Sequence, residues 1–402
     1  MKVAFFLEAD SKNPGGYNQT LSTVTFINEK NKHNEDIVYV ANSQNLKNKL
    51  TEKGINSLLY KRTFFDKLIN YYLGLSFLFK GLIKFNLQHS FTKFFKKNNI
   101  DLIFFLSPSN LSLFCGDINF VLSVWDLDHK KDSPFPEHRE NFIFEKREFF
   151  LNNVLSKAFK VIVPHNRNKE DLIKFYNCNK DKILVQTLIP YLPKISKKEL
   201  KFTSKQEEQA VEDLPINKKI ILYPASFWAH KNHKYILDSA MLLKQDNIND
   251  FYFVMCGADR GVYDFINQFI KDNNISDKAC TLPLISNFCL KRLYEKCFAV
   301  IMPTDTGPTN LPLYEAMFFK KPIFYSINIL DDAEIGEVII PINVKDPNSF
   351  VDKLKNLEKE NISKKIELGK NYYKNFCNDE AAYGLYFDII TEFKKILNQW
   401  KK

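Results

Sequence analysis

The sequence predicts an α/β protein with two doubly wound domains, each built around a parallel sheet. The chain has 402 residues, more than the roughly 100 to 200 residues of one typical domain. Short apolar runs alternate with helical patterns in both halves, as in repeated βαβ units. A charged stretch at residues 196–215 interrupts this alternation and indicates a linker.

The strand-like runs set the expected domain boundaries. They lie at residues 3–7, 37–40, 102–106, 120–124 and 161–163 in the first half, and at 219–223, 251–255, 298–302 and 322–325 in the second. We therefore expect a first domain at 1–195, a second at 216–378, and a C-terminal helix at 379–402 that crosses back to the first. Ligands of such sheets bind at the carboxyl ends of the strands, so a cleft between the two domains is expected.

Composition narrows the class of protein. Hydrophobic residues make up 45% of the chain, which argues against disorder. The seven cysteines form no CxxC pair, which is typical of reduced thiols in the cytoplasm and argues against structural zinc. The longest apolar stretch, residues 68–79, is well short of the roughly 20 residues that cross a bilayer. We expect a cytoplasmic chain without a secretory signal or a spanning segment.

The most informative segment is residues 300–318, a strand end followed by a loop rich in Gly, Pro and Asn and by a helix that starts near Pro312. Such a loop offers backbone N–H groups and the positive end of a helix dipole to a diphosphate or a sugar hydroxyl. Glu315, in the first turn, could accept hydrogen bonds from ribose hydroxyls and would then lie outside any core network. The alternative is a helix-stabilising Glu beside a turn. The candidate binding residues are Asp305, Gly307, Asn310, Leu311 and Glu315.

A second segment, residues 223–233, follows the first strand of the second domain. A lysine at this place, Lys231, would neutralise a departing diphosphate. Ser226 and His230 are further candidates for contacts with phosphate. The alternative is a solvated basic helix cap.

Two more segments follow strands of the first domain. Acids and a histidine gather at residues 124–140, which makes Asp126 and His129 candidate catalytic residues that contact the donor sugar or the acceptor. A structural polar turn is the alternative. Gly15 and Gly16 lie in a predicted loop before the first helix, where glycine permits close approach to a ligand. This is not the GxGxxG pattern of dinucleotide-binding enzymes.

These segments together resemble the retaining glycosyltransferases of family 4. Residues 310–317 with Lys321 and Pro322 look like the end of the family's C-terminal signature, and residues 124–140 resemble the WDL-x-H and PFPE elements of one subgroup. Glu315 matches the ribose-binding Glu of the family, and Lys231 the lysine of its phosphate-binding element. Two positions depart from the pattern. Gly307 stands where the family has a first Glu, and Ser226 stands where many relatives carry Arg.

The resemblance implies a GT-B fold of two Rossmann-like domains that face a central cleft. It also implies a UDP-sugar or GDP-sugar donor, retention of the anomeric configuration, and neither cofactor nor metal. The acceptor would be a saccharide or lipid-linked saccharide in cell-surface polysaccharide or glycan assembly. Lys231 and the amides near Leu311 would stabilise the departing diphosphate. A catalytically inactive nucleotide-sugar-binding protein and a nucleotide-sugar epimerase or phosphorylase remain as alternatives on the same fold.

Basic residues alternate with aromatic residues at 61–72 and 91–97, in a chain of net charge +10. Such stretches can rest on an anionic bilayer, which would place the protein at the inner membrane face. Buried core helices with lysines that reach solvent are the alternative, and an AT-rich coding sequence would also account for the charge. No nucleic acid partner is expected.

Overall fold

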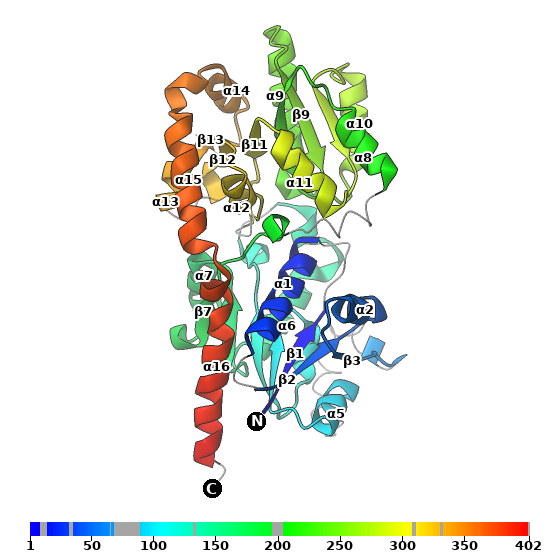
Figure 1. Cartoon of the computed structure of the whole chain (residues 1–402), viewed down its shortest axis with the longest axis vertical. Helices are drawn as coiled ribbons and strands as arrows, with labels where there is room; N and C mark the ends of the chain where they lie inside the picture. Colours follow the sequence, from blue (N-terminus) through cyan, green and yellow to red (C-terminus); the bar gives the residue numbers. More distant parts are fainter. Residues whose placement is uncertain are drawn as a thin grey trace. The chain divides into compact units, whose positions relative to one another are not determined.

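The computed structural model describes residues 1–8, 14–31, 35–64, 66–67, 89–131, 134–194, 204–307, 311–329 and 333–400. The chain divides into two compact units (Figure 1). Unit 1 comprises Met1–Leu188 and Asp379–Lys402, and unit 2 comprises Ile189–Asn378. Each contains a parallel sheet between helices, so the predicted α/β class with two doubly wound domains is confirmed.

The sheet of unit 1 has the order β3-β2-β1-β4-β5-β6-β7, and all its strand pairs are parallel. Its strands are β1 (Lys2–Leu7), β2 (Asp36–Ala41), β3 (Ser57–Leu59), β4 (Leu102–Phe105), β5 (Asn119–Ser123), β6 (Lys160–Val163) and β7 (Ile183–Val185). Its α-helices are α1 (Pro14–Lys30), α2 (Gln44–Glu52), α5 (Ser90–Lys97), α6 (Ile143–Val154), α7 (Asn166–Tyr176) and α16 (Asp379–Trp400). The order reverses between β1 and β4, where doubly wound sheets bind their ligands.

The helix at the end of the chain, α16, belongs to unit 1 and is red in Figure 1. The ring of Tyr386 packs on the sheet, with centroids 5.7 Å from Phe5 and 5.5 Å from Phe104. Its hydroxyl donates to Gln186 Oε1 at 3.0 Å. Tyr383 packs against Phe26 of α1. These buried contacts explain why a segment so distant in sequence completes this unit.

The sheet of unit 2 has the order β10-β9-β8-β11-β12-β13, again with parallel pairs throughout. Its strands are β8 (Lys219–Pro224), β9 (Phe251–Cys256), β10 (Ala279–Leu282), β11 (Ala299–Met302), β12 (Ile323–Ser326) and β13 (Ile340–Ile342). Its α-helices are α8 (Lys205–Glu212), α9 (His233–Gln245), α10 (Tyr263–Asp272), α11 (Asn287–Lys296), α12 (Leu311–Phe318), α13 (Ala333–Val338), α14 (Asn348–Lys355) and α15 (Ile362–Phe376). The reversal here lies between β8 and β11.

Helix α8 lies inside the stretch 196–215 that we expect to be a linker. It buries Val211 completely in the core of unit 2, and its Glu212 pairs with Lys296 of α11 at 2.8 Å. The charged residues that suggest a linker form the solvent face of an amphipathic helix. Residues 195–203 lie outside the described part of the chain.

Helix α5 contains the basic and aromatic residues 91–97, which we expect to rest on an anionic membrane. Phe91 and Phe95 are fully buried in the core of unit 1, whereas Lys93, Lys96 and Lys97 are exposed. The aromatic face of α5 therefore packs into the protein rather than into a bilayer, as the alternative interpretation holds. The apolar stretch 68–79 lies outside the described residues.

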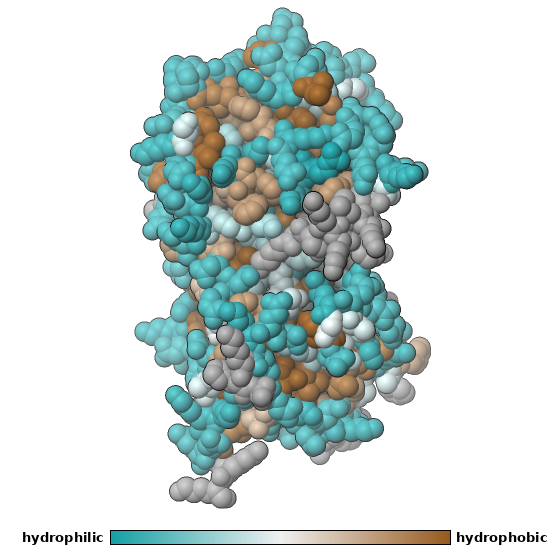
Figure 2. Space-filling model, in the orientation of Figure 1, coloured by the Kyte–Doolittle hydropathy of each residue, from teal (hydrophilic) through white to brown (hydrophobic). Residues whose placement is uncertain are grey.

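The surface in view is mostly hydrophilic over both units, with hydrophobic side chains in small groups (Figure 2). This agrees with helices whose apolar stripes face their own sheet. Among the residues that the structure describes, no helix is long and apolar enough to cross a membrane.

Candidate functional site

Two loops of unit 2 come together where the order of its strands reverses. The loop after β8 carries the short 3-10 helix η8 (Ala229–Lys231), and the loop after β11 carries Asp305. The hydroxyl of buried Tyr223 donates to the carbonyl oxygen of Lys231 at 2.7 Å and lies 3.1 Å from Thr304 Oγ1. The Asp305 amide donates to the carbonyl oxygen of His230 at 3.0 Å. Three predicted site residues, His230, Lys231 and Asp305, are thereby joined through their backbones.

The loop after β11 leads into α12. Gly307 has a φ of +109°, which only glycine adopts without strain. The backbone conformation therefore explains why glycine, and not glutamate, occupies position 307. The carboxylate of Asp305 accepts from Asn328 Nδ2 at 3.2 Å. Leu311 is the first residue of α12, next to the predicted start at Pro312. Asn310 lies outside the described residues. Ser226 is half-buried in the loop after β8.

Glu315 differs from the prediction in one respect. It is 8% exposed, and its Oε2 accepts a hydrogen bond from the hydroxyl of buried Tyr294 on α11 at 2.7 Å. Burial raises the pKa of this carboxyl from 4.5 to about 7. We expected a carboxylate outside any core network, and the structure shows one that also supports the core. Tyr294 could not be paired with Glu315 from the sequence, because the two helices meet only in the folded unit.

A pocket of about 510 Å³ lies within unit 1, at the carboxyl ends of β1, β4 and β5. Its walls include Trp125 and Asp126 after β5, and Ile143, Arg147 and Phe150 of α6. It thus combines apolar and aromatic surface with a few charged groups, as small-molecule sites commonly do.

Asp126 lies at this pocket, as predicted for a ligand contact. Its Oδ1 accepts from Arg147 at 2.6 Å, and the same guanidinium donates to the backbone oxygen of Asp126 at 2.8 Å. Burial raises the pKa of Asp126, but the Arg147 charge and hydrogen bond outweigh it and hold the pKa below its usual value. The side chain keeps 37% of its area exposed. It therefore offers an ionised, oriented hydrogen-bond acceptor.

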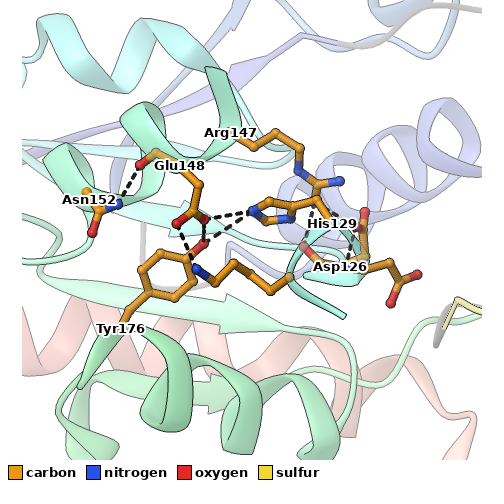
Figure 3. A network of polar contacts seen from close by, with 8 residues as sticks. Asp126, His129, Arg147, Glu148, Asn152 and Tyr176 are labelled. Carbon is orange, nitrogen blue, oxygen red and sulfur yellow. Dashed lines mark hydrogen bonds and ion pairs between the residues drawn. The ribbon is translucent and has the colours of Figure 1, made fainter. Parts of the chain in front are cut away.

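His129, predicted as a catalytic residue, lies in a buried network of polar contacts (Figure 3). It is completely buried, and its Nε2 lies 3.0 Å from Glu148 Oε1 of α6 and 3.2 Å from the hydroxyl of Tyr176 of α7. Lys130 binds the other oxygen of Glu148 at 2.8 Å. Burial lowers the pKa of His129 to about 4, so the ring is neutral at pH 7. In this structure the His129 side chain holds the segment after Asp126 against α6 and α7.

Glu8 also lines the pocket, although the sequence analysis does not select it. It follows β1 directly, and its carboxylate is hydrogen-bonded to Arg62 and to Ser109. Its backbone oxygen accepts from Ser107 Oγ at 2.7 Å. An acid immediately after a central strand is the one signal that could have found it, since its partners come from segments far away in sequence.

Gly15 and Gly16 lie in the first turn of α1, not in a loop. A Cβ atom on Gly16 would come within 2.5 Å of the Trp125 ring. The helix can therefore approach the segment after β5 only with glycine at this position. Close packing against the Trp125 ring is therefore one reason for glycine at position 16. Gly15 is exposed.

Comparison with known proteins agrees with this geometry. Residues 204–375, nearly all of unit 2, match the sequence model of the family "Glycosyl transferases group 1". The matched region is less than half of the chain, and it contains Lys231, Asp305 and Glu315 together with α12.

One curated relative and two solved structures are similar. The O-antigen chain mannosyltransferase RfbU of Salmonella typhimurium is 23% identical over 211 residues, which span 52% of this chain and about half (54%) of that relative. A glycosyltransferase from Rickettsia africae superposes with a TM-score of 0.70 at 16% identity, covering 98% of both chains. Anabaena HepE, solved with UDP and glucose, has a TM-score of 0.68 at 13% identity, covering 98% of this chain and 100% of its own. At these identities the structures establish the GT-B fold.

Glu315 should make stability depend on pH. The folded protein keeps a proton on this group that the unfolded chain releases between pH 4.5 and about 7, so the free energy of unfolding should fall as the pH rises through this window. Glu315→Gln, which mimics the protonated carboxyl and still accepts from Tyr294, should flatten that decline. Urea unfolding at several pH values, followed by circular dichroism, measures both slopes.

Glu315→Ala is the companion variant. It leaves the buried Tyr294 hydroxyl without its acceptor and should lower the free energy of unfolding by about 1 to 3 kcal/mol. Equal pH slopes in the wild type and Glu315→Gln, with a fully stable Glu315→Ala, would show that the Tyr294–Glu315 bond does not support the fold.

Proposed function

We propose that this protein is a retaining glycosyltransferase that moves a sugar from a UDP-sugar or GDP-sugar to a saccharide or lipid-linked saccharide acceptor. The observation that carries the proposal is the junction of the loops after β8 and β11. The Tyr223 bridge brings the segment of Lys231 to the loop that leads into α12. A cationic side chain and a helix N-terminus at one reversal point suit a diphosphate.

The donor side of the reaction follows from this arrangement. Lys231 and the backbone amides at the start of α12, near Leu311, stabilise the charge that grows on the departing diphosphate. Glu315 accepts hydrogen bonds from the ribose with the oxygen that Tyr294 does not use. An oxygen of the departing phosphate takes the proton of the acceptor hydroxyl as the new glycosidic bond forms on the same face of the sugar. Neither a protein nucleophile nor a cofactor or metal is required.

For the acceptor we propose the pocket of unit 1. The carboxylates of Asp126 and Glu8 are oriented by Arg147 and Arg62, and both are suited to accept hydrogen bonds from sugar hydroxyls. The ring of Trp125 supplies an apolar wall for the C–H face of a sugar. The two arginines that pair with these carboxylates also line the pocket, so its hydrogen-bonding groups suit a hydroxyl-rich acceptor.

The similar proteins support the biological setting of this proposal. One relative is named for the assembly of an O-antigen chain, and HepE was solved with UDP and glucose. We therefore propose a role in the assembly of a cell-surface polysaccharide or glycan.

Incubation of the protein with radiolabelled UDP-sugars and GDP-sugars, with and without an extract of membrane glycolipids and saccharides, tests the function. A glycosyltransferase moves label into acceptor only when acceptor is present. Conversion of the donor sugar to an epimer without acceptor would instead identify an epimerase. Donor binding without any turnover would identify an inactive binding protein.

Lys231→Ala should lower kcat about tenfold or more at saturating donor, because the lysine meets charge that increases in the transition state. It should change stability little, since Tyr223 binds the backbone oxygen of residue 231 rather than its side chain. Lys234→Ala is the matched control, because Lys234 lies three residues further on and pairs with Asp238 on α9. If Lys231→Ala keeps the full kcat, the catalytic role is wrong and Lys231 serves only as a helix cap.

We also propose that the protein binds anionic membranes reversibly through its positive charge. The exposed lysines of α5 contribute to this attraction, since a lysine near an anionic surface adds about 1 kcal/mol; Lys96 also pairs with Asp117 at 2.7 Å. The attraction fades beyond about 8 Å at physiological salt. A lipid-linked acceptor would give such binding a purpose.

Sedimentation with anionic or neutral liposomes tests the membrane proposal. Binding should require anionic lipid and low salt, and a variant with Lys93, Lys96 and Lys97 changed to Glu should remain in the supernatant. Changing Lys234, Lys359 and Lys370 to Glu alters the net charge equally on unit 2 and serves as the control. Recovery of the wild type in the supernatant with every lipid would overturn the proposal.

A further inference from the structure

The loop after β9, residues 257–262, packs against and is hydrogen-bonded to the loop that carries Lys231. A Cβ atom on Gly257 would come within 2.3 Å of the carbonyl oxygen of Ala225 and 2.7 Å of the amide nitrogen of Ser226, so the two backbones touch there. The amide of Phe227 donates to the carbonyl oxygen of Ala258 at 2.9 Å. Phe227 also pairs with the next residue, Asp259, in a parallel bridge. The two loops thus form one surface.

Arg260 lies in the loop after β9, and its side chain points toward Trp228 in the loop after β8. Its guanidinium carbon lies 5.4 Å from the centroid of the Trp228 ring, and that ring lies near His230, with centroids 6.4 Å apart. A guanidinium over an indole is attracted by its π-system and loses rotamer freedom. Arg260 is therefore oriented before any ligand arrives.

The backbone around Arg260 is equally constrained. Asp259 Oδ1 accepts a hydrogen bond from the amide of Gly261 at 2.8 Å, which closes a turn around Arg260. Gly261 has a φ of +105°, a conformation that favours glycine. The Asp259 carboxylate is thereby directed at the backbone. A cation held in this way loses little conformational entropy on binding.

We infer that Arg260 binds the diphosphate of the nucleotide donor together with Lys231, an inference that rests on the proposed function. The two cations come from loops after the adjacent strands β8 and β9, and the loop after β9 contacts residues 225–227 of the loop after β8. The loop after β8 supplies a lysine and a histidine but no arginine. Arg260 adds the planar, permanently charged group that can bind two phosphate oxygens at once.

The test measures the affinity of UDP and GDP by calorimetry in the wild type, Arg260→Ala, Arg260→Gln and Arg260→Lys. We expect Arg260→Ala and Arg260→Gln to bind UDP and GDP about tenfold or more weakly than the wild type. Arg260→Lys should recover part of this affinity. Arg260→Gln keeps much of the side-chain length, so it separates lost charge from lost packing on Trp228. Arg292→Ala is the matched control, because this arginine of the same unit pairs with Glu212 on α8.

A second readout separates phosphate contact from base contact. The matching nucleosides, uridine and guanosine, should bind the wild type and Arg260→Ala equally in ligand-observed NMR titrations. Unchanged UDP and GDP affinity in both neutral variants would overturn the inference and leave the proposed function intact. An equal loss for nucleoside and diphosphate would overturn the assignment to phosphate. A wild type that binds neither UDP nor GDP would overturn the proposed function itself.

Discussion

The buried hydroxyl of Tyr223 holds together the two loops on which the proposed donor site depends. It lies on β8, contacts the carbonyl oxygen of Lys231 at 2.7 Å and lies 3.1 Å from the hydroxyl of Thr304 after β11. Burial raises the pKa of Tyr223, so the group remains a protonated donor at physiological pH. A buried acceptor that lost this donor would carry a desolvation cost, which makes the bond a strong constraint on loop position. Together with the hydrogen bond from the Asp305 amide to the carbonyl oxygen of His230, it holds the segments of Lys231 and Asp305 near each other.

The pocket of unit 1 is built on the same principle. Polar residues in and behind its wall position the Asp126 carboxylate that lines the cavity. Behind Asp126, the neutral ring of His129 joins Glu148 and Tyr176, while Arg147 fixes the carboxylate itself. The hydrogen bonds and ion pairs of this network favour one arrangement of the loop, because breaking any of them would leave a buried polar group without its partner. The loop after β5 is thereby held in place although it is not a regular element.

Much of the fold was predictable, because periodicity and strand-like runs are local properties of the sequence. The start of α12 at Leu311 and the position of Lys231 after β8 follow from local signals. Helix α8 was not predicted, because its charges dominate and only Val211 marks its buried face. The partners of Glu8 and Glu315 could not be predicted either. They meet only when distant segments fold together, and a single sequence carries no signal for such pairs.

The central claim is that the joined loops of unit 2 form a nucleotide site, and Tyr223→Phe tests it most directly. The substitution keeps the buried ring and removes only the hydroxyl that contacts Lys231 and Thr304. Calorimetric titration of the folded variant with UDP and GDP should show clearly weaker binding than in the wild type, although Tyr223 itself contacts no ligand in this account. Wild-type affinity in Tyr223→Phe would contradict the claim that this bridge assembles the site.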